Sequence, residues 1–256
     1  MEILFLGTCA CDYSPRLKTD LADRFDDDAR RSSSMLIDGR YLVDCGDHTL
    51  DSLRIAEIDP RGITDVFITH LHHDHYNASH IEKIALAASR RLRVWVRADA
   101  SVPHVENADM IKMAVGKKYR VTDGFDVTGL AANHDAAACP HHFLFEKDGK
   151  KLMYACDGGW FLNSTWYAMK KLDLDLFVMD ATCGDYLGDF RIGEHNTLPM
   201  IFVMLPSLKK WGTVSEKTKI YLSHLAPSLH APHKETEQLV APHGLTVARD
   251  GLKIEI

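Results

Sequence analysis

The chain has 256 residues, 46% of them hydrophobic and 26% charged, so it has enough apolar material for a large core and is expected to be globular. The 36 acidic residues outnumber the 30 basic ones, which argues against a protein that coats nucleic acid, and no apolar run approaches the roughly 18 residues of a membrane helix. Six cysteines are too few for a disulfide scaffold, and the N-terminus lacks the features of a signal peptide, so we expect a cytoplasmic protein.

The first half of the chain alternates short apolar runs with stretches of helical periodicity. Asp38-Gly39 joins two of the apolar runs as a hairpin turn, and Ser79 and Glu82 are spaced like a capping box. The predicted strands cover residues 3–6, 34–37, 41–43, 66–69 and 92–96, and the predicted helices cover residues 51–57 and 78–89. The polar segment between Asp12 and Ser34 is expected to be a solvated loop or short exposed helix, with a flap over a site as the alternative.

The second half continues the same alternation. Pro206 is expected to kink or end the long helix that contains it, and Asp250-Gly251 predicts a terminal hairpin over residues 245–256. The predicted strands cover 119–132 (two short strands), 143–145, 152–155, 176–179 and 220–222, and the predicted helices cover 165–172, 198–211 and 234–240. No internal repeat or Pro/Gly/Ser linker interrupts the pattern, so we expect one domain over residues 1–256, built from two sheets with interspersed helices.

The sharpest motif is His70-Leu71-His72-His73-Asp74-His75, which directly follows a predicted strand. In an extended backbone, His70 and His72 project to the same side. Catalytic zinc is held by two histidines and a third ligand, with one coordination position left open. Asp74 and His75 would face a second metal. The motif therefore predicts a catalytic metal site rather than polar residues that open a helix.

Further ligands are expected at the ends of later strands, because this motif cannot complete two coordination spheres alone. His134, Asp157 and His224 each stand at the carboxyl end of a predicted strand, and Gly158-Gly159 after Asp157 lets the backbone pass close to an ion. Seven candidates are too many for one tetrahedral ion. We therefore predict two divalent ions about 3.5 Å apart. Zinc and manganese are preferred and iron remains an alternative, because coordination spheres of His and Asp accept all three metals.

This order of residues resembles the metallo-β-lactamase-fold hydrolases over essentially the whole chain. The resemblance implies a four-layer αββα sandwich with a dinuclear site at the edge between its two sheets. The implied ligands are His70, His72 and His134 for one metal and Asp74, His75 and His224 for the other, with Asp157 bridging them. Asp44 matches an early aspartate of the family that supports the metal-binding histidines.

The fold hosts lactamases, thioesterases, lactonases, nucleases, phosphodiesterases and redox proteins, so other residues must select the reaction. Lactamases with two zincs usually place Cys where Asp157 stands, and glyoxalase-type thioesterases tend to carry Gly-His-Thr where this chain has Asn133-His134-Asp135. Both comparisons argue against these two classes.

Asp180 and His195 resemble the acidic strand end and downstream histidine of the phosphodiesterase branch, which includes tRNase Z and the cyclic phosphodiesterase of phosphonate degradation. In those enzymes the histidine contacts the phosphate and is placed to protonate the leaving oxygen. An alkoxide needs that proton even where metals neutralise the phosphoryl oxygens and generate the attacking hydroxide. We therefore predict a phosphodiesterase acting on a small substrate, cyclic diesters included, with His195 as general acid, Asp180 beside it and Asp74 in the catalytic set.

Two departures from that branch refine the expectation. The phosphonate-pathway enzyme uses an N-terminal cysteine cluster for a structural zinc, of which only Cys9 and Cys11 remain, so free thiols are expected. The basic arm with which tRNase Z grips tRNA has no counterpart, so no stable nucleic-acid or membrane partner is expected; a homodimer is left open. The alternatives are a carboxylic ester or lactone hydrolase on the same metals, a tRNase Z-like nuclease, and a redox or metal-sensing member of the fold.

Two histidine pairs lie outside the motif. His141 and His142, and His230 and His233, are expected to be exposed loop residues, with pocket lining as the alternative. Trp160, Phe161 and Trp166 follow the predicted bridging residue, and all three are expected to pack in the core rather than against a substrate.

Overall fold

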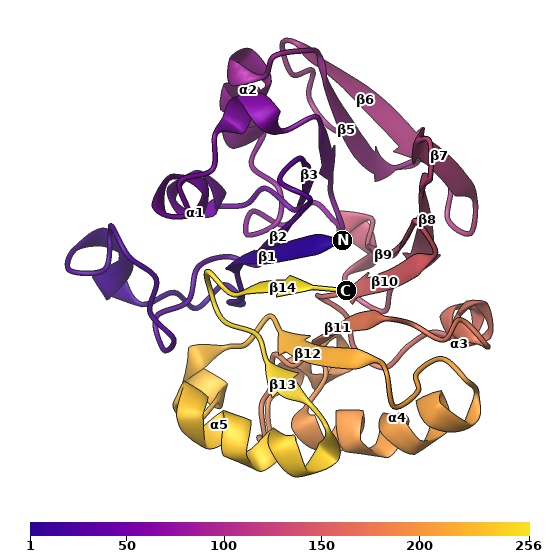
Figure 1. Cartoon of the computed structure of the whole chain (residues 1–256). Coiled ribbons are helices and arrows are strands. Elements are labelled where there is room, and N and C mark those ends of the chain that lie inside the picture. Colours follow the sequence, from indigo (N-terminus) through magenta and orange to yellow (C-terminus); the bar gives the residue numbers. More distant parts are fainter.

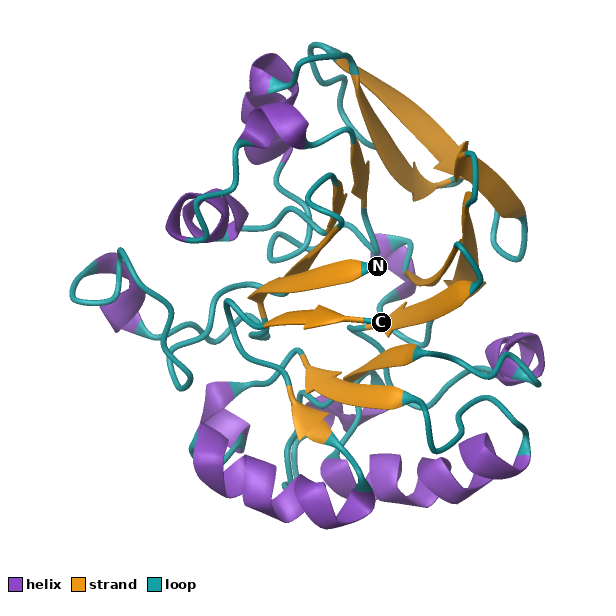
Figure 2. Cartoon of the chain, in the orientation of Figure 1, coloured by secondary structure: helices purple, strands orange, loops and turns teal.

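Two seven-stranded sheets pack face to face, and helices cover the outer face of each (Figures 1 and 2). The computed structural model describes residues 1–256. The first sheet contains β1 (Glu2–Gly7), β2 (Ser34–Ile37), β3 (Tyr41–Val43), β4 (Asp65–Phe67), β5 (Leu92–Arg97), β6 (Ala108–Met113) and β14 (Lys253–Glu255). The second contains β7 (Lys118–Thr122), β8 (Phe125–Ala131), β9 (His141–Lys147), β10 (Lys150–Ala155), β11 (Leu176–Asp180), β12 (Lys219–Ser223) and β13 (Thr246–Val247).

Five α-helices complete the layers, and they are α1 (Thr49–Ile55), α2 (Ala78–Ala87), α3 (Asn163–Met169), α4 (Leu198–Lys210) and α5 (His233–Val240). Helices α1 and α2 pack on the first sheet, and α3, α4 and α5 pack on the second (Figure 1). This arrangement confirms the predicted αββα sandwich. None of these helices has the length and apolar character needed to cross a membrane.

The strands bury both of their faces, as the sandwich requires. On β1, Ile3 and Phe5 belong to the core between the sheets, whereas Leu4 and Leu6 belong to the core beneath α1 and α2. This division follows from the two-residue period of a strand. Between the sheets, Phe67 stacks on a tryptophan ring at 5.6 Å between centroids and meets three phenylalanine rings edge-on.

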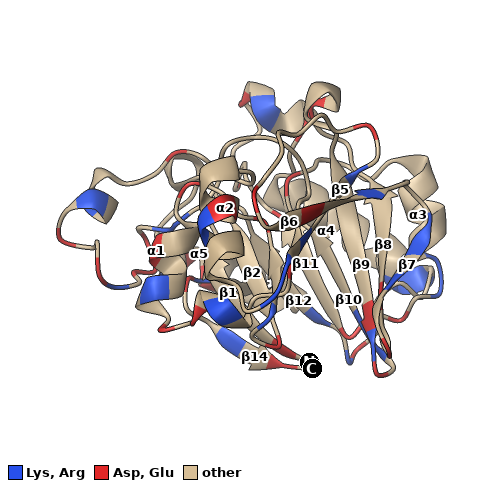
Figure 3. Cartoon of the chain, turned by 90° about the horizontal axis from the view of Figure 1, so that it is seen from above, with Lys and Arg blue, Asp and Glu red and all other residues tan.

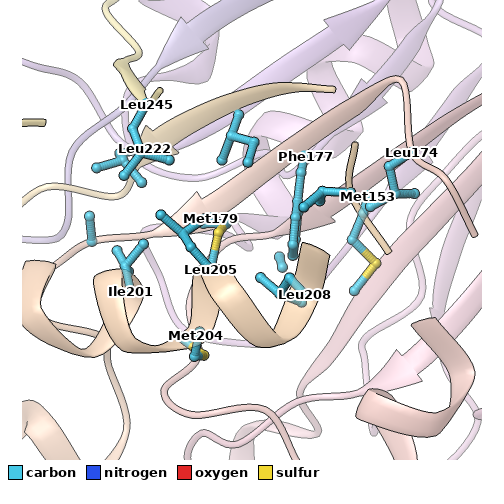
Figure 4. Close-up of a cluster of buried hydrophobic side chains, with 14 of the residues drawn as sticks. Met153, Leu174, Phe177, Met179, Ile201, Met204, Leu205, Leu208, Leu222 and Leu245 are labelled. Carbon is cyan, nitrogen blue, oxygen red and sulfur yellow. The ribbon is translucent and has the colours of Figure 1, made fainter. Parts of the chain in front are cut away.

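Beneath the second sheet, α4 supplies most of the apolar contact. Its residues Ile201, Leu205 and Leu208 pack against Phe177 and Met179 of β11 (Figure 4). Fully burying each such side chain contributes about 1.5–3 kcal/mol, which holds the helix on the sheet. The sequence predicts that the helix is kinked or ends at Pro206. The helix continues through Pro206 to Lys210, so it does not end there. Burial of Leu205 and Leu208 on either side of Pro206 accounts for this continuity.

Each sheet combines antiparallel and parallel strands. The order of the first sheet is β14-β1-β2-β3-β4-β5-β6, and β3 to β6 are parallel. The order of the second sheet is β13-β12-β11-β10-β9-β8-β7, and β10 to β13 are parallel. Because parallel strands end at the same edge of a sheet, the loops after β3 and β4 share one edge of the first sheet. The loops after β10, β11 and β12 likewise share one edge of the second sheet.

The predicted terminal hairpin is wrong. β13 pairs with β12 in the second sheet, whereas β14 pairs with β1 in the first, so the Asp250-Gly251 turn carries the chain from one sheet to the other. The Asp250 side chain is buried in this turn, where it accepts hydrogen bonds from the Arg31 backbone N–H at 2.7 Å and the Thr8 hydroxyl at 2.8 Å. Contacts with distant segments therefore replace the local pairing that the turn residues suggest.

Three further expectations need correction. The cap of α2 is Asn77, whose Oδ1 accepts from two backbone N–H groups, rather than the Ser79/Glu82 box. Strand β6 was not predicted, because it is an edge strand without regular alternation of burial. The segment between Asp12 and Ser34 is not simply solvated: Arg31 is 1% exposed and donates to the backbone oxygens of Leu21 and Arg24.

Candidate metal centre

Loops after four strands bring all seven predicted ligands to one place, at the edge where the two sheets meet. They are His70, His72, Asp74 and His75 after β4, His134 after β8, Asp157 after β10 and His224 after β12. Three of the four strands belong to parallel pairs and end at the same edge, which explains how residues so distant in sequence converge.

The side chains form two clusters that share one residue. The His70 cluster consists of His70, His72, His134 and Asp157, and the Asp74 cluster consists of Asp74, His75, His224 and Asp157. Within each cluster the ligand atoms all lie within 4.8 Å of one another. Oδ2 of Asp157 lies 3.0 Å from Nε2 of His70 and 3.4 Å from Nε2 of His224, so one carboxylate reaches both clusters.

Histidine nitrogens face one another inside both clusters. Nδ1 of His72 lies 3.1 Å from Nε2 of His70 and 3.0 Å from Nε2 of His134, and Nε2 of His75 lies 3.1 Å from Nε2 of His224. A neutral imidazole has one donor and one acceptor nitrogen, so such groups cannot satisfy one another fully. Nδ1 of His134 and Oδ1 of Asp157 are buried without a hydrogen-bond partner. Lone pairs that converge in this way fit divalent cations.

The pKa values of the side chains in the clusters also indicate a cation site. Burial alone would lower the pKa of His224, but the charge of Asp157 and hydrogen bonds to Asp180 and Asp74 raise it to about 10. Burial would raise the pKa of Asp157, but the nearby His224 and His70 hold it well below its usual range. The carboxylates therefore stay ionised and stabilise positive charge, as a cation site requires.

Asp44, which follows β3, holds the Asp74 cluster from behind. It is fully buried, and its Oδ2 lies 2.7 Å from Nδ1 of His75. Its Oδ1 accepts from the backbone N–H of Thr69 at 2.8 Å and from the Thr69 hydroxyl at 2.9 Å. Such contacts fix the orientation and tautomer of a ligating histidine. Thr69 stands directly before His70 in the sequence, and this position could have indicated the role of Thr69.

The backbone is strained at three of these positions. Asp44, Asp157 and His224 have φ angles of +60°, +58° and +58°, in the left-handed region that non-glycine residues seldom adopt. Such conformations cost on the order of 1–3 kcal/mol and persist at sites where the surrounding structure enforces them. Here each strained residue immediately follows or lies close to the end of a strand and turns its side chain into the clusters.

Asp180 and His195 lie against the same site. Oδ2 of Asp180 is 3.1 Å from Nδ1 of His195, and that nitrogen is also 3.1 Å from Oδ1 of Asp157. Burial lowers the pKa of His195, but the charge and hydrogen bond of Asp180 outweigh burial and raise it. The Thr182 hydroxyl, not predicted from the sequence, donates to Asp180 at 2.8 Å and lies 2.7 Å from Nδ1 of His224.

The glycines after Asp157 allow neighbouring segments to pack closely. A Cβ atom on Gly158 would lie 2.7 Å from Cε1 of His142, and one on Gly159 would lie 3.1 Å from the backbone nitrogen of His195. Gly159 therefore lets the segment that carries His195 approach the loop that carries Asp157, and Gly158 lets β9 approach it.

The two other histidine pairs differ from expectation. His141 and His142 lie on β9 and are buried, with Nε2 of His141 2.8 Å from the backbone oxygen of Ile68. Burial lowers the pKa of His142 to about 3, so its ring is neutral. His230 is half-buried, with Nε2 2.6 Å from the backbone oxygen of Ala181, and Nδ1 of His233 lies 2.9 Å from the Arg30 guanidinium. None of these four residues belongs to the clusters.

Trp160 is 41% exposed, so the expectation that it packs in the core is wrong. The expectations for the other two aromatic residues and for the thiols agree with the structure. Phe161 is buried among the side chains of the core beneath the second sheet, and Trp166 packs against that core. The thiols of Cys9 and Cys11 are both free, the first buried and the second exposed.

Residues 39–197, more than half of the chain, match the model of the beta-lactamase superfamily domain. Ribonuclease Z of Methanothermobacter thermautotrophicus is 37% identical over 76 residues, and that of Lactococcus lactis subsp. lactis is 40% identical over 78 residues. These matches cover 29% of this chain and only 21% and 22% of the relatives, so the matched segment spans about a fifth of their length.

Solved structures resemble the whole chain. A diphosphatase from the PhnP family has a TM-score of 0.75 at 18% identity, covering 100% of this chain and 96% of that one. Zn²⁺-bound PqqB from Methylobacterium extorquens has a TM-score of 0.74 at 18% identity, with 100% of both chains covered. The short form of human tRNase Z has a TM-score of 0.67 at 19% identity, covering 100% and 99%. At these identities the likeness shows the fold.

Proposed function

Since the chain belongs to the beta-lactamase superfamily, as a metal-dependent hydrolase with a buried His/Asp centre, we propose that it hydrolyses small phosphodiesters, cyclic ones included. One observation carries the proposal: Nδ1 of His195 lies 3.1 Å from Asp180 and 3.1 Å from Asp157. A buried, carboxylate-held histidine beside the residue shared by both clusters is suited to protonating an alkoxide leaving group.

Two divalent ions, zinc or manganese, held by the His70 and Asp74 clusters would activate water and neutralise the phosphoryl oxygens. The hydrogen bonds of the His195 ring run through Nδ1, to Asp180 and to the Thr182 hydroxyl, so Nε2 is the nitrogen that can transfer a proton. Asp180 fixes the ring, and the backbone N–H of Asn196 in turn holds Oδ1 of Asp180 at 2.9 Å. The leaving oxygen takes the proton from Nε2 as its bond to phosphorus breaks.

The relatives support hydrolysis at phosphorus without deciding the substrate. The PhnP-family structure is that of a diphosphatase, and the curated relatives are ribonucleases Z. Zinc-bound PqqB shares the fold, which favours zinc among the divalent ions.

A tRNase Z-like nuclease is the second candidate, favoured by the 37% identity over 76 residues to a ribonuclease Z. The net charge of −6 argues against it, because binding of a polyanion needs a basic surface. Figure 3 shows Lys and Arg interspersed with Asp and Glu along the same elements rather than gathered on one of them. A small diester therefore fits this chain better than a tRNA, and we expect no stable nucleic-acid partner.

The decisive experiment is a substrate panel on the metal-loaded protein. Bis(p-nitrophenyl) phosphate, a cyclic nucleotide, p-nitrophenyl acetate, a γ-lactone and a precursor tRNA would be compared by kcat/KM. We expect the diesters to be preferred over the esters and lactone. Preference for the carboxylic substrates would overturn the proposal, and cleavage of the precursor tRNA with no turnover of small diesters would establish the nuclease instead.

A further inference from the structure

A polar groove opens beside the Asp74 cluster, and the reaction described above makes no use of it. It lies between the chain from Cys11 to Lys18 on one side, the start of α1 from Asp47 to Asp51 on the other, and Ser228. Its volume is about 870 Å³, within the range of roughly 300–1,000 Å³ that is usual for small-molecule sites.

Both walls of the groove are fastened to the segments that carry the Asp74 cluster. The backbone N–H of Ala10 donates to Leu225, the neighbour of His224, at 2.9 Å, and the backbone N–H of Cys45 donates to His75 at 2.8 Å. Gly46 packs so closely on the motif that a Cβ atom there would lie 1.8 Å from the backbone oxygen of Asp74. The groove therefore lies against the loops that carry the Asp74 cluster.

Three residues in the walls keep a polar atom buried without a hydrogen-bond partner. They are Oδ1 of Asp12, the hydroxyl of Tyr13 and Nδ1 of His48. The other carboxylate oxygen of Asp12 accepts from the backbone N–H of Ser228 at 3.0 Å and from its hydroxyl at 2.5 Å, so the side chain is held in place. The Tyr13 and His48 rings meet edge-on with centroids 4.3 Å apart. Buried polar atoms without partners are rare in folded proteins, and three in one groove indicate a ligand.

The protonation states of these groups define what they can bind. Burial, followed by the charges of Asp74 and Asp47, raises the pKa of Tyr13 far above its usual value, so its hydroxyl remains a donor. Burial lowers the pKa of His48, so its ring is neutral and has one acceptor nitrogen. Three carboxylates, Asp12, Asp47 and Asp51, face one cation, Lys18, which disfavours a second phosphate.

We propose that this groove is the subsite for an uncharged polyol portion of the substrate, a glycerol or sugar group esterified to the phosphate held at the clusters. The inference rests on the proposed function. Hydroxyl groups of the polyol donate to Oδ1 of Asp12 and to His48 and accept from the hydroxyl of Tyr13. The carboxylates repel a further anionic group, so the same groove selects diesters whose second ester group is uncharged over nucleic acid.

The test compares two substrates that differ only in this portion. Glyceryl p-nitrophenyl phosphate and methyl p-nitrophenyl phosphate share one charge and one leaving group. On the metal-loaded full chain, kcat/KM should favour the glyceryl diester. Tyr13→Phe and Asp12→Asn should each reduce that preference by about 3- to 10-fold through KM, the effect of one lost hydrogen bond. Tyr167→Phe, a change on the exposed tyrosine of α3, should leave the preference as it is.

Equilibrium binding supplies a second readout that needs no turnover. Calorimetry should show glycerol 1-phosphate binding more tightly than methyl phosphate, with the difference reduced in Tyr13→Phe. Equal kcat/KM for the two diesters, or a preference that survives both variants, overturns the subsite while leaving the phosphodiesterase proposal standing. If the protein hydrolyses neither diester but hydrolyses carboxylic esters rapidly, the phosphodiesterase proposal is refuted instead. In that case, equal binding of glycerol 1-phosphate and methyl phosphate refutes the subsite as well.

Discussion

Nδ1 of His195 lies 3.1 Å from Oδ2 of Asp180, and the same carboxylate oxygen lies 3.3 Å from Nδ1 of His224. One fully buried aspartate therefore orients both the predicted general acid and a residue of the Asp74 cluster. This link joins the residue proposed to move the proton to the side chains proposed to hold a metal. Because of this link, proton transfer and metal binding can be distinguished only by measuring metal content and kinetics on the same variants.

His195→Ala tests the general acid. We expect both metals to be retained and kcat on a diester with an alkyl leaving group to fall by roughly 10²–10⁴. The fall on a p-nitrophenyl diester should be much smaller, because that leaving group hardly needs a proton. Equal losses on both substrates would indicate phosphate positioning, and loss of metal would indicate that His195 is a ligand.

Asp180→Asn should affect more than acid catalysis. Because Asp180 also contacts His224, the variant should lose both the leaving-group-dependent part of kcat and about 10- to 100-fold in metal affinity. Steady-state kinetics with the two diesters and chelator competition measure these effects separately. An unchanged metal affinity would show that the contact with His224 has no role in holding the ion.

The two clusters that share Asp157 predict two ions per chain by elemental analysis of protein purified without chelators. Asp157→Ala should lose both ions together, because its carboxylate reaches the His70 and Asp74 clusters. His73→Ala is the matched control within the motif: its exposed ring points to Asp47, 2.8 Å away, and belongs to neither cluster. Two ions retained in Asp157→Ala would remove the bridging role.

Asp44→Asn should weaken binding of the metal in the Asp74 cluster by about 10- to 100-fold, because Asp44 holds Nδ1 of His75 at 2.7 Å. Asp65→Asn provides the control for loss of a buried carboxylate. Asp65 binds Arg93 and the Trp95 indole N–H instead, so that variant should lower the free energy of unfolding without changing metal affinity. Chelator titration and urea unfolding of both variants distinguish orientation of a ligand from general destabilisation.

Asp250 predicts a pH dependence of stability. Burial raises its pKa from 3.8 to about 6, so the folded chain binds this proton more tightly than the unfolded chain. The resulting stabilisation is complete below about pH 4 and is lost as the pH rises through 6, amounting to up to about 3 kcal/mol. Relative to the wild type, Asp250→Asn should therefore gain that much free energy of unfolding between pH 4 and 7, measured by urea titration. A difference that does not vary with pH would contradict the raised pKa.

Much of the fold could be predicted because its signals are local. The hairpin turn at Asp38-Gly39 is confirmed, since turn residues act within four positions of one another. The convergence of His70, Asp157 and His224 was predictable for a related reason. Each follows an apolar strand that belongs to a parallel pair, and parallel strands end at a common edge.

Other features depend on contacts between segments far apart in the chain. Asp250-Gly251 has the residues of a hairpin turn, but Asp250 pairs with Thr8 and Arg31 and the chain crosses between the sheets. No local pattern could show that Thr182 lies between Asp180 and His224, or that Asp12 meets Ser228 at the groove. The sequence alone therefore determined most of the strands, the turn at Asp38-Gly39 and the ligand types, because these follow from neighbouring residues. Tertiary packing decided which distant polar groups share a buried space, because the cost of burying them is met only by partners that the fold brings together.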